Sequence, residues 1–505
     1  MITLHDAAAI RAAEQAHASD LAAGVLMDRA AHGLAQAVID LLLASRGRIV
    51  GTRVVLLVGP GNNGGDALHA GAKLARRGLK VEAISAVAEP HVSGVDALAR
   101  AGGRLLHWPS DECASVLESA EVILDGLLGI GAQGELREPI AGVAQAVRGT
   151  SALVIAVDVP SGLDADTGLC AADTVMADQT ITFGGLKSGL VVMPGKEFVG
   201  GVRVIDIGIA DALRTLGSSL DADDVSHWLP EPALGDYKYR RGVLGIVAGS
   251  RQYLGAAFLT TSAAASADIG MVEYLDRDDG LAHQVVAAHP PLVVTASDPA
   301  GNARVNAWAI GPGFSGEQGD AEALAAILRC ATPVVVDAGA LTVLAASAEL
   351  RELVRSRIHP TVLTPHDGEF ARLSSISLAE GRIAAAQALA QELRVIVVLK
   401  GSGTIIAGPD GQLLVDQMGT AVLGTAGSGD VLTGIMGALF ASAAARSRTR
   451  VNDTMAATIA AAACWLHGAA GVLASQGGLP VTATDLVAAL PGAVARVRQP
   501  ARMIQ

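Results

Sequence analysis

The chain has 505 residues, a length at which one hydrophobic core usually divides, so at least two domains are expected. Hydrophobic residues make up 51% of the chain and aromatic residues only 3%, so its interior must consist mainly of Ala, Val, Leu and Ile. The formal net charge of −13 argues against a nucleic-acid binder that neutralises phosphates, and any bound phosphate must be held locally.

Neither a signal peptide nor a membrane span is expected. The first residues, MITLHDAAAIRAAEQ, carry acidic side chains early, and Gly, Pro or charged residues interrupt the apolar stretches short of the roughly 20 residues that span a bilayer. The cysteines form no cluster with zinc-ligand spacing, which favours buried thiols; they are Cys113, Cys170, Cys330 and Cys464. We therefore expect a cytoplasmic enzyme without a membrane partner.

About forty residues of helical pattern open the chain, and they include LMDRAAHGLAQAVIDLLL. This layer is expected to pack beside a sheet or across a subunit interface. Short β-branched runs then alternate with alanine-rich stretches in both halves, which predicts parallel sheets covered by helices on both faces. The predicted strands are residues 54–58, 122–124, 153–157, 245–248, 305–310, 334–336 and 395–399.

The predicted fold class is therefore α/β in each of two domains. Residues 209–241 are less regular and carry SSLDADD, PEP and the basic YKYRR cluster, so we place the boundary near residue 215. The domains would be residues 1–215 and 216–505. An alanine-rich helical surface favours a homo-oligomer.

The segment VVLLVGPGNNGGDA, residues 54–67, joins an apolar run to a glycine- and asparagine-rich turn and a helical pattern. A phosphate can bind where such a helix begins, because the first amides are unpaired and the helix N-terminus is partly positive. A tight strand-to-helix turn uses the same residues, so a purely structural role stays open. The segment contains neither a Walker loop nor a strict GxGxxG.

Two more predicted strands lead into an aspartate and then a glycine-rich turn: Asp125 in ILDGLLGIGAQGE and Asp158 in AVDVPSGLDADTG. The carboxyl ends of parallel strands converge on the ligand crevice, so Asn63, Asp125 and Ser161 are expected to cluster. Their oxygens suit an alkali or other hard cation, and the absence of nearby Cys or His disfavours zinc. Alternatively, the two aspartates cap helices or turns.

These motifs, followed by TFGGLKSGL, resemble the N-terminal domain of the bifunctional NAD(P)H-hydrate repair enzymes, the NAD(P)H-hydrate epimerase. The resemblance spans most of residues 1–210 and implies a Rossmann-like three-layer sandwich. It also implies potassium at Asn63, Asp125 and Ser161, and makes Asp158 a candidate for polarising the C6 hydroxyl of the substrate. The residues implied to bind the hydrated dinucleotide are Asn62, Asn63, Gly64, Gly65, Asp66, Gly129, Ile130, Gly131, Ala132, Gln133, Gly134, Glu135 and Asp158.

In the second half, GSGD precedes VLTGIMGALFA and places backbone amides beside Asp430 at a predicted helix start. Backbone donors stabilise charge on a transferring phosphoryl group, and a carboxylate can accept the proton of an attacking hydroxyl. This pairing fits phosphoryl transfer to an alcohol, although a buried capping aspartate is the alternative. Lys400 precedes a glycine turn that suits nucleotide phosphates, whereas His366 in TPHDGEFARL could equally be structural.

Together with AGSRQYLGAA and IGPGFSG, these segments resemble the ribokinase-like C-terminal domain of the same family, the ADP-dependent NAD(P)H-hydrate dehydratase, over about residues 225–495. The resemblance implies that Asp430 takes the proton of the C6 hydroxyl as it attacks the terminal phosphate of ADP, after which elimination leaves NAD(P)H, AMP and phosphate. Magnesium is the expected counter-ion. The implied nucleotide-binding residues are Lys400, Gly401, Ser402, Gly403, Thr404 and Gly429; the hydrate-binding residues are Ala256, Gly313, His366 and Asp430.

The expected substrates are thus NADH hydrate, NADPH hydrate and ADP. Two alternatives stay open: the C-terminal half could be a small-molecule kinase that leaves a stable phosphorylated product, and the N-terminal half could bind a dinucleotide or a protein without catalysis. The residues do not decide between ADP and ATP, or between the two hydrates.

Overall fold

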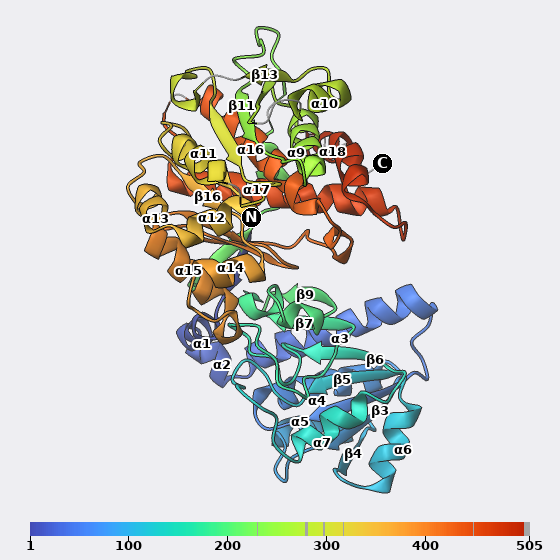
Figure 1. Ribbon diagram of the computed structural model, residues 1–505. Coiled ribbons are helices and arrows are strands. Elements are labelled where there is room, and N and C mark those ends of the chain that lie inside the picture. The colour runs from blue at the N-terminus through green and yellow to red at the C-terminus, as the bar shows by residue number, and fades with distance from the viewer. Residues whose placement is uncertain (230, 278–280, 296–297, 317, 448, 499–505) are drawn as a thin grey trace. The chain divides into compact units, whose positions relative to one another are not determined.

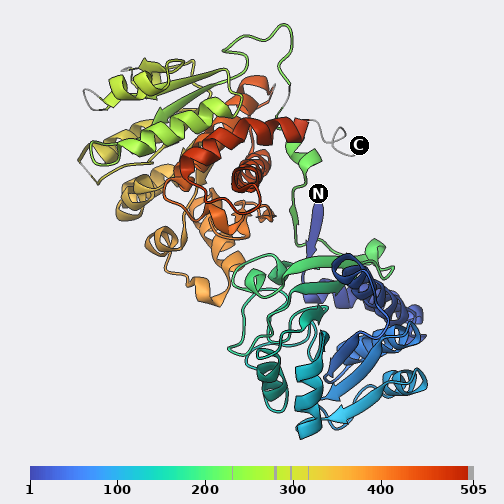
Figure 2. The same cartoon turned by 90° about the vertical axis from the view of Figure 1, so that its right-hand side faces the viewer.

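A computed structural model describes residues 1–229, 231–277, 281–295, 298–316, 318–447 and 449–498. The chain divides into two compact units: Thr3–Leu216, and Gly217–Gln505 together with Met1–Ile2. Each unit contains a mainly parallel β-sheet with helices, so the predicted α/β class is confirmed for both (Figures 1 and 2).

The N-terminal unit has a seven-stranded parallel sheet in the order β4-β3-β2-β5-β6-β7-β9. The chain runs outward from β2 to β4 and returns to β5, so the strand order reverses between β2 and β5, where ligands bind in such sheets. The strands are β2 (Arg53–Val58), β3 (Lys80–Ser85), β4 (Arg104–His107), β5 (Val122–Gly126), β6 (Leu153–Val157), β7 (Gln179–Phe183) and β9 (Gly201–Ile205); β1 (Ile2–His5) pairs separately with β8 (Leu186–Lys187).

Helices cover both faces of this sheet. Leu34 and Val38 pack in one core with Leu56 of β2, which confirms that the early helical layer lies beside the sheet. That layer follows a short strand, β1, that the pattern did not predict. One face carries α3 (Val25–Arg46), α4 (Asn62–Arg76) and α5 (Val92–Arg100), and the other carries α6 (Asp111–Ser119) and α7 (Ile140–Val147); α1 (Ala7–Ala16) and α2 (Ala18–Ala22) precede them.

In the C-terminal unit the strands follow the order β13-β12-β11-β14-β15-β16-β17-β18-β19-β10. The prediction of wholly parallel sheets is wrong at one edge, where β17, β18 and β19 pair antiparallel because short turns, too short for a crossover helix, connect them. The strands are β10 (Gly217–Ser219), β11 (Val243–Val247), β12 (Met271–Leu275), β13 (Val293–Thr295), β14 (Ala307–Ile310), β15 (Val334–Val336), β16 (Thr361–Leu363), β17 (Ile396–Leu399), β18 (Thr404–Ala407) and β19 (Leu413–Asp416).

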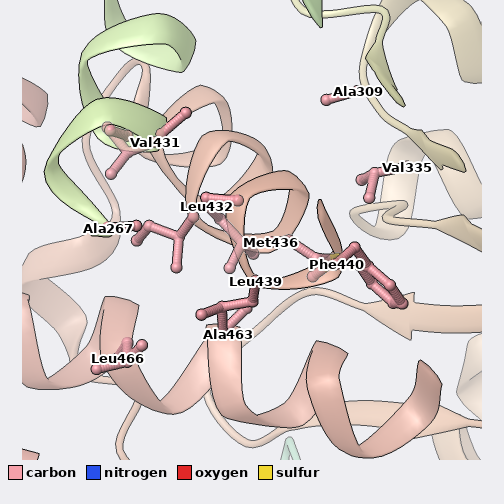
Figure 3. Close-up of a cluster of buried hydrophobic side chains, with 14 of the residues drawn as sticks. Ala267, Ala309, Val335, Val431, Leu432, Met436, Leu439, Phe440, Ala463 and Leu466 are labelled. Carbon is pink, nitrogen blue, oxygen red and sulfur yellow. The ribbon is translucent and has the colours of Figure 1, made fainter. Parts of the chain in front are cut away.

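The central helix of this unit is α16, whose apolar side chains are buried on nearly every side. Figure 3 shows Met436, Leu439 and Phe440 of α16 in one cluster with Ala463 and Leu466 of α17. The helices are α8 (Ala222–Ser226), α9 (Leu254–Ser266), α10 (Leu281–Ala288), α11 (Gln318–Leu328), α12 (Gly339–Ala346), α13 (Ala348–Arg355), α14 (Asp367–Leu373), α15 (Arg382–Leu393), α16 (Ser428–Arg446), α17 (Asp453–Ser475) and α18 (Ala483–Arg498).

By length and composition alone, α16 and α17 are apolar enough to cross a membrane, so the expectation that every apolar stretch is too short fails for them. Both helices combine many alanine residues with large apolar side chains such as Phe440 and Leu466. Most of each apolar window, 72% and 78% respectively, is buried within the unit, as in the core helix of a globular domain.

All four cysteines are free, which agrees with the absence of a disulfide or zinc pattern. Cys113, Cys330 and Cys464 are buried as predicted, whereas Cys170 is only half-buried. Burial raises the pKa of Cys170 to about 11, so its thiol stays protonated and unreactive at neutral pH.

Candidate active sites in the two units

The sequence predicts residues 59–66 as a turn before a helix, but the turn after β2 is shorter and α4 already begins at Asn62, so residues 62–66 are helical. Gly59 passes so close to the backbone of Leu127 that a Cβ atom there would overlap the Leu127 carbonyl group. Only glycine permits this approach, which brings the turns after β2 and β5 together. The Asn63 side-chain amide then donates a hydrogen bond to the carbonyl of Leu128 at 2.8 Å.

Asn63, Asp125 and Ser161 are brought together around this turn. The amide of Leu128 donates to Ser161 Oγ at 2.9 Å, and Ser161 donates through its hydroxyl and its amide to the two carboxylate oxygens of Asp125, at 2.7 and 2.8 Å. Asp125 is fully buried, and burial raises its pKa although these hydrogen bonds oppose the rise. Within the described chain, no Lys or Arg forms an ion pair with it. Carboxylate, hydroxyl and amide oxygens of this kind are the ligands that hard cations prefer.

Asp158 lies at the end of β6 with φ of 67°, a left-handed conformation that Asp tolerates better than most residues. Its Oδ1 accepts hydrogen bonds from the Lys187 ammonium group at 2.6 Å, the Thr182 hydroxyl at 3.0 Å and the Phe183 amide at 3.1 Å. Lys187 is completely buried. The described residues make no hydrogen bond to Oδ2, so this oxygen is available to a ligand.

A cavity of about 510 Å³ is lined by Asn63, Asp158 and Lys187, whereas Asp125 and Ser161 are not among its lining residues. Glu14 and Asp66 line it beside Asp158 and Lys187. Burial, and then the negative charges of Asp158 and Glu14, raise the pKa of Asp66 well above its usual range. Burial also raises the pKa of Glu14. The cavity therefore combines an ionic Asp–Lys pair with carboxyl groups that hold protons more tightly than usual.

Most of the substrate-binding residues predicted for this unit line the cavity, but some do not. Gly64 and Gly65 are buried inside α4, and Gln133, Gly134 and Glu135 are not among the lining residues. The carboxylate of Glu135 accepts a hydrogen bond from the Ala172 amide at 3.1 Å. The lining residues that were predicted are Asn62, Asn63, Asp66, Gly129, Ile130, Gly131, Ala132 and Asp158.

In the C-terminal unit, Gly427 has φ of 85° and turns the chain into α16, with Asp430 in the first turn of the helix. No side chain caps this helix start. Gly429 lies beside Lys400 and Asp337: a Cβ atom on this glycine would be 3.5 Å from Lys400 Nζ. Because glycine has no side chain, the space next to the two charged groups is left for a ligand. A cavity of about 540 Å³ opens at this point.

Asp337 and Lys400 form a buried pair in the wall of this cavity. Lys400 Nζ donates to Asp337 Oδ1 at 2.8 Å, and the hydroxyls of Thr364 and Thr433 donate to the Asp337 carboxylate at 2.6 and 2.7 Å. Burial alone would raise the pKa of Asp337, but Lys400 and the two hydroxyls outweigh it and lower this pKa. Asp337 is therefore a stable negative charge at neutral pH.

Asp430 is in the opposite situation. Burial, and then the charges of Asp337 and Glu369, raise its pKa to about 7, although Lys400 opposes the rise. A carboxyl group with a pKa near the working pH is suited to general-base catalysis, because it is ionised yet basic enough to accept a proton. This property separates Asp430 from a simple helix cap.

Most of the predicted nucleotide-binding residues line this cavity, and Gly403 is the exception. The lining residues are Lys400, Gly401, Ser402, Thr404 and Gly429. His366 lines it too, and its ring also caps α14 by accepting a hydrogen bond from the Gly368 amide at 3.0 Å. Both proposed roles of this histidine are thus compatible with its position.

Ala256 and Gly313 lie together but outside this set of lining residues. A Cβ atom on Gly313 would be 2.9 Å from the Cβ atom of Ala256. They form a tightly packed contact between the α9 helix and the turn after β14.

Several residues in the two cavities were not predicted. Asp337 directly follows the predicted strand 334–336, just as Asp125 and Asp158 follow or end theirs, so the same pattern of an apolar run and then an aspartate applies to it. Lys187 lies in the recognised TFGGLKSGL segment, but a lysine in an apolar run does not identify its partner. His467 also lines the C-terminal cavity, where the hydroxyl of Ser428 is 3.1 Å from its Nε2, and no sequence pattern relates the two.

The chain is similar to two families whose matches fall in separate units. Residues 23–189 match the family described as YjeF-related protein N-terminus, and residues 244–492 match the family described as NAD(P)H-hydrate dehydratase. The first match contains the turn at Asn62 and the cluster at Asp125; the second contains Lys400 and Asp430.

Curated relatives match across both units. The chain is 42% identical to the bifunctional NAD(P)H-hydrate repair enzyme Nnr of Mycobacterium tuberculosis, with 86% of this chain and 88% of the relative covered. It is 39% identical to the protein of the same name from Mycobacterium leprae, with 97% and 99% covered. A solved structure of the ADP/ATP-dependent NAD(P)H-hydrate dehydratase from Bacillus subtilis, co-crystallised with ATP and Mg²⁺, is 26% identical, covers 56% of this chain and 99% of that chain, and has a TM-score of 0.47.

Proposed function

The chain belongs to the family of bifunctional NAD(P)H-hydrate repair enzymes, and from that premise we propose which residues perform each of its two reactions. The protein interconverts the R and S hydrates of NADH and NADPH, and it dehydrates the S form in a nucleotide-dependent reaction. We assign the epimerase to residues 1–215 and the dehydratase to residues 216–505. The separate family matches and the separate cavities support this division.

In the epimerase, the C–O bond at C6 must break and reform on the opposite face of the ring. We assign the proton for the departing hydroxyl to Asp66, because burial raises its pKa and so favours the protonated carboxyl group; water then leaves and the ring nitrogen shares the positive charge. Asp158 Oδ2 then orients the water that adds back, and Asp66 recovers its proton. Lys187 holds the other oxygen of Asp158 in place.

The donor set of Asn63, Asp125 and Ser161 fits potassium. Asp125 is a buried carboxyl without an ion pair in the described chain, and its neighbours supply further oxygen atoms. A bound cation would offset the charge of Asp125 and of the substrate phosphates. The fully buried position of Asp125 is the observation that supports this assignment.

In the dehydratase, the C6 hydroxyl oxygen attacks the terminal phosphorus of ADP while Asp430 accepts the hydroxyl proton. The bond from that phosphorus to the bridging oxygen breaks and AMP departs, with Lys400 and the first amides of α16 holding the charge. The phosphate then leaves C6 with the C–O electron pair, and loss of the C5 proton restores the ring double bond. The raised pKa of Asp430 is the observation that carries this proposal.

Magnesium is proposed as the counter-ion of the nucleotide. The described residues contain no preformed group of three His, Cys, Asp or Glu side chains that could hold a metal. Magnesium usually keeps several waters and binds one or two carboxylates together with substrate phosphates, so Asp337 and Glu369 would suffice on the protein side. The phosphoryl donor that we propose is ADP, and either hydrate is the substrate.

We also propose the compartment, the partners and the oligomeric state of the protein. The charge of −13 and the free cysteines support a cytoplasmic protein with no nucleic-acid partner and no membrane partner, and the alanine-rich helical surface supports a homo-oligomer. The kinase and pure-binder alternatives fit the family less well, since its members carry both repair activities by name.

The test uses purified R and S hydrates of NADPH, with recovery of NADPH measured by its absorbance in the presence of magnesium and ADP. Asp158→Asn should slow recovery from the R form by about 100-fold or more while recovery from the S form continues. Asparagine tolerates the left-handed conformation of residue 158, so the backbone should be preserved. Asp173→Asn, which removes a surface partner of Arg148, is the matched control.

Unchanged recovery from R in Asp158→Asn would exclude this residue from the epimerase. Accumulation of a stable phosphorylated hydrate, without NADPH, would instead favour the kinase alternative.

A further inference from the structure

The N-terminal unit contains a second cavity, of about 500 Å³, on the other side of the α4 start. It shares four lining residues with the cavity that contains Asp158: Glu14, Asn62, Asp66 and Phe183. Asp158 and Lys187 line only the first cavity. The two cavities are therefore neighbours with a common wall, and only one of them holds the paired groups proposed to react.

The shared wall is where a phosphate group would bind. Asn62 is the first residue of α4, a helix of 15 residues, and the amides of a helix start attract phosphate. Asp66, one turn further along, is buried, and no hydrogen bond from the described residues reaches its carboxyl. A buried carboxyl group that lines both cavities and has no partner among the described residues can form a hydrogen bond with a ligand that crosses the wall.

The second cavity has the chemistry of a site for a flat aromatic group. His69 and His91 meet edge to face, with ring centroids 5.8 Å apart and an interplanar angle of 72°. Leu26 and Met27 add aliphatic surface, and Ser93 lies 3.1 Å from His69 Nε2. Burial, and then the nearby His91 and Lys73, lower the pKa of His69, so its ring is neutral at neutral pH. A neutral imidazole ring can stack on a base without a negatively charged group beside it.

We propose that this second cavity binds the adenosine half of the hydrated dinucleotide, with the pyrophosphate at the start of α4 and the hydrated nicotinamide beside Asp158. The inference rests on the proposed epimerase function and adds to it a recognition site for the non-reacting nucleoside. Stacking and hydrogen bonding at His69, His91 and Ser93 supply binding energy, while the chemistry takes place across the shared wall.

The experiment compares two substrates that share the hydrated nicotinamide mononucleotide; only NADPH hydrate also carries the adenylate half with its 2′-phosphate. Epimerisation of the R and S hydrates of NADPH, and of reduced nicotinamide mononucleotide, is followed in the full-length protein by chromatographic separation of the epimers. Removing the ring in His69→Ala should raise KM for NADPH hydrate about 10-fold with little change in kcat, since stacking of one base on an aromatic ring is worth roughly that much or more. KM for the mononucleotide hydrate should not change.

Two further variants make the result specific. His69→Phe keeps a flat ring and should retain most of the affinity for NADPH hydrate. His32→Ala removes an exposed histidine of α3 that lines neither cavity, and it should behave as the wild type. His69 is preferred to His91 for the test because the His91 ring accepts a hydrogen bond from the Gly94 amide at the start of α5.

A variant His69→Ala that changes KM equally for both substrates, or for neither, overturns the adenosine site while leaving the epimerase intact. Equal KM values for the two substrates in the wild type would overturn it as well. Failure of the wild type to speed epimerisation of either substrate would instead refute the proposed function on which the site depends.

Discussion

The described residues include two buried lysine–aspartate pairs with different surroundings. In the N-terminal unit, Lys187 binds Asp158 through one oxygen and leaves the other to the cavity. In the C-terminal unit, Lys400 binds Asp337, and the charge of Asp337 helps to raise the pKa of its neighbour Asp430. One pair thus fixes the orientation of a carboxylate that we propose to be catalytic, whereas the other raises the pKa of a separate carboxyl group.

Asp430 must be ionised to accept a proton, so the dehydratase rate should depend on pH through this group. Its pKa of about 7 predicts that kcat/KM for the S hydrate falls as the pH drops below 7 and reaches a plateau above it. Measurement of kcat/KM across this range, with saturating ADP, tests the assignment. Asp430→Asn should remove dehydration at every pH and leave epimerisation intact.

Glu369→Gln provides the matched test of the cause, since after burial and Asp337 the charge of Glu369 also raises this pKa. The fall in kcat/KM should then shift to lower pH. A profile with no acidic fall, or one that Glu369→Gln leaves unmoved, would contradict the proposed electrostatics.

At the scale of elements, both sites lie where a glycine-rich turn enters a helix, at α4 and at α16. The second of these helices is buried on almost all sides, so it must fit closely between α9 and the sheet. With so few aromatic residues in the chain, small side chains make this possible: a Cβ atom on Gly434 would overlap the Thr260 carbonyl group of α9.

Gly434→Ala should therefore destabilise the C-terminal unit by about 1–3 kcal/mol through overpacking against backbone that cannot move aside. Gly492→Ala, in the interior of α18, is the control, because its Cβ atom would make an ordinary contact of 3.6 Å with Leu473. That substitution should be neutral or stabilising by up to about 1 kcal/mol. Calorimetric unfolding of both variants gives the comparison, and equal transition temperatures would show that α16 can move away from α9.

At the scale of the whole molecule, the cavities proposed for the two reactions belong to two α/β units with separate cores. A mixture of Asp158→Asn and Asp430→Asn should consequently restore repair of R-NADPH hydrate, since the S hydrate made by one protein can diffuse to the other. Recovery of NADPH absorbance by the mixture, compared with each variant alone, measures this. Failure to complement would mean that the intermediate must remain on one chain.

The strands at the sites were predictable because their signals are local. The apolar run before GPGNNGGD became β2, and the runs before Asp125 and Asp158 became β5 and β6. The antiparallel edge of β17 to β19 was not predicted, because strand direction depends on turn length and pairing partners rather than on the apolar pattern of each strand.

By itself, the sequence determined the two α/β halves, the phosphate-type turns at Asn62 and Asp430, and, through its motifs, the resemblance to a repair family. These properties depend on neighbouring residues or on motifs read one at a time. Only the tertiary structure decided that Lys187 pairs with Asp158, that Lys400 pairs with Asp337, and that His69 and His91 share a cavity wall with Asp66. The two ion pairs and the contact of His91 with His69 join different segments, and the resulting desolvation and charge depend on how the segments pack in three dimensions.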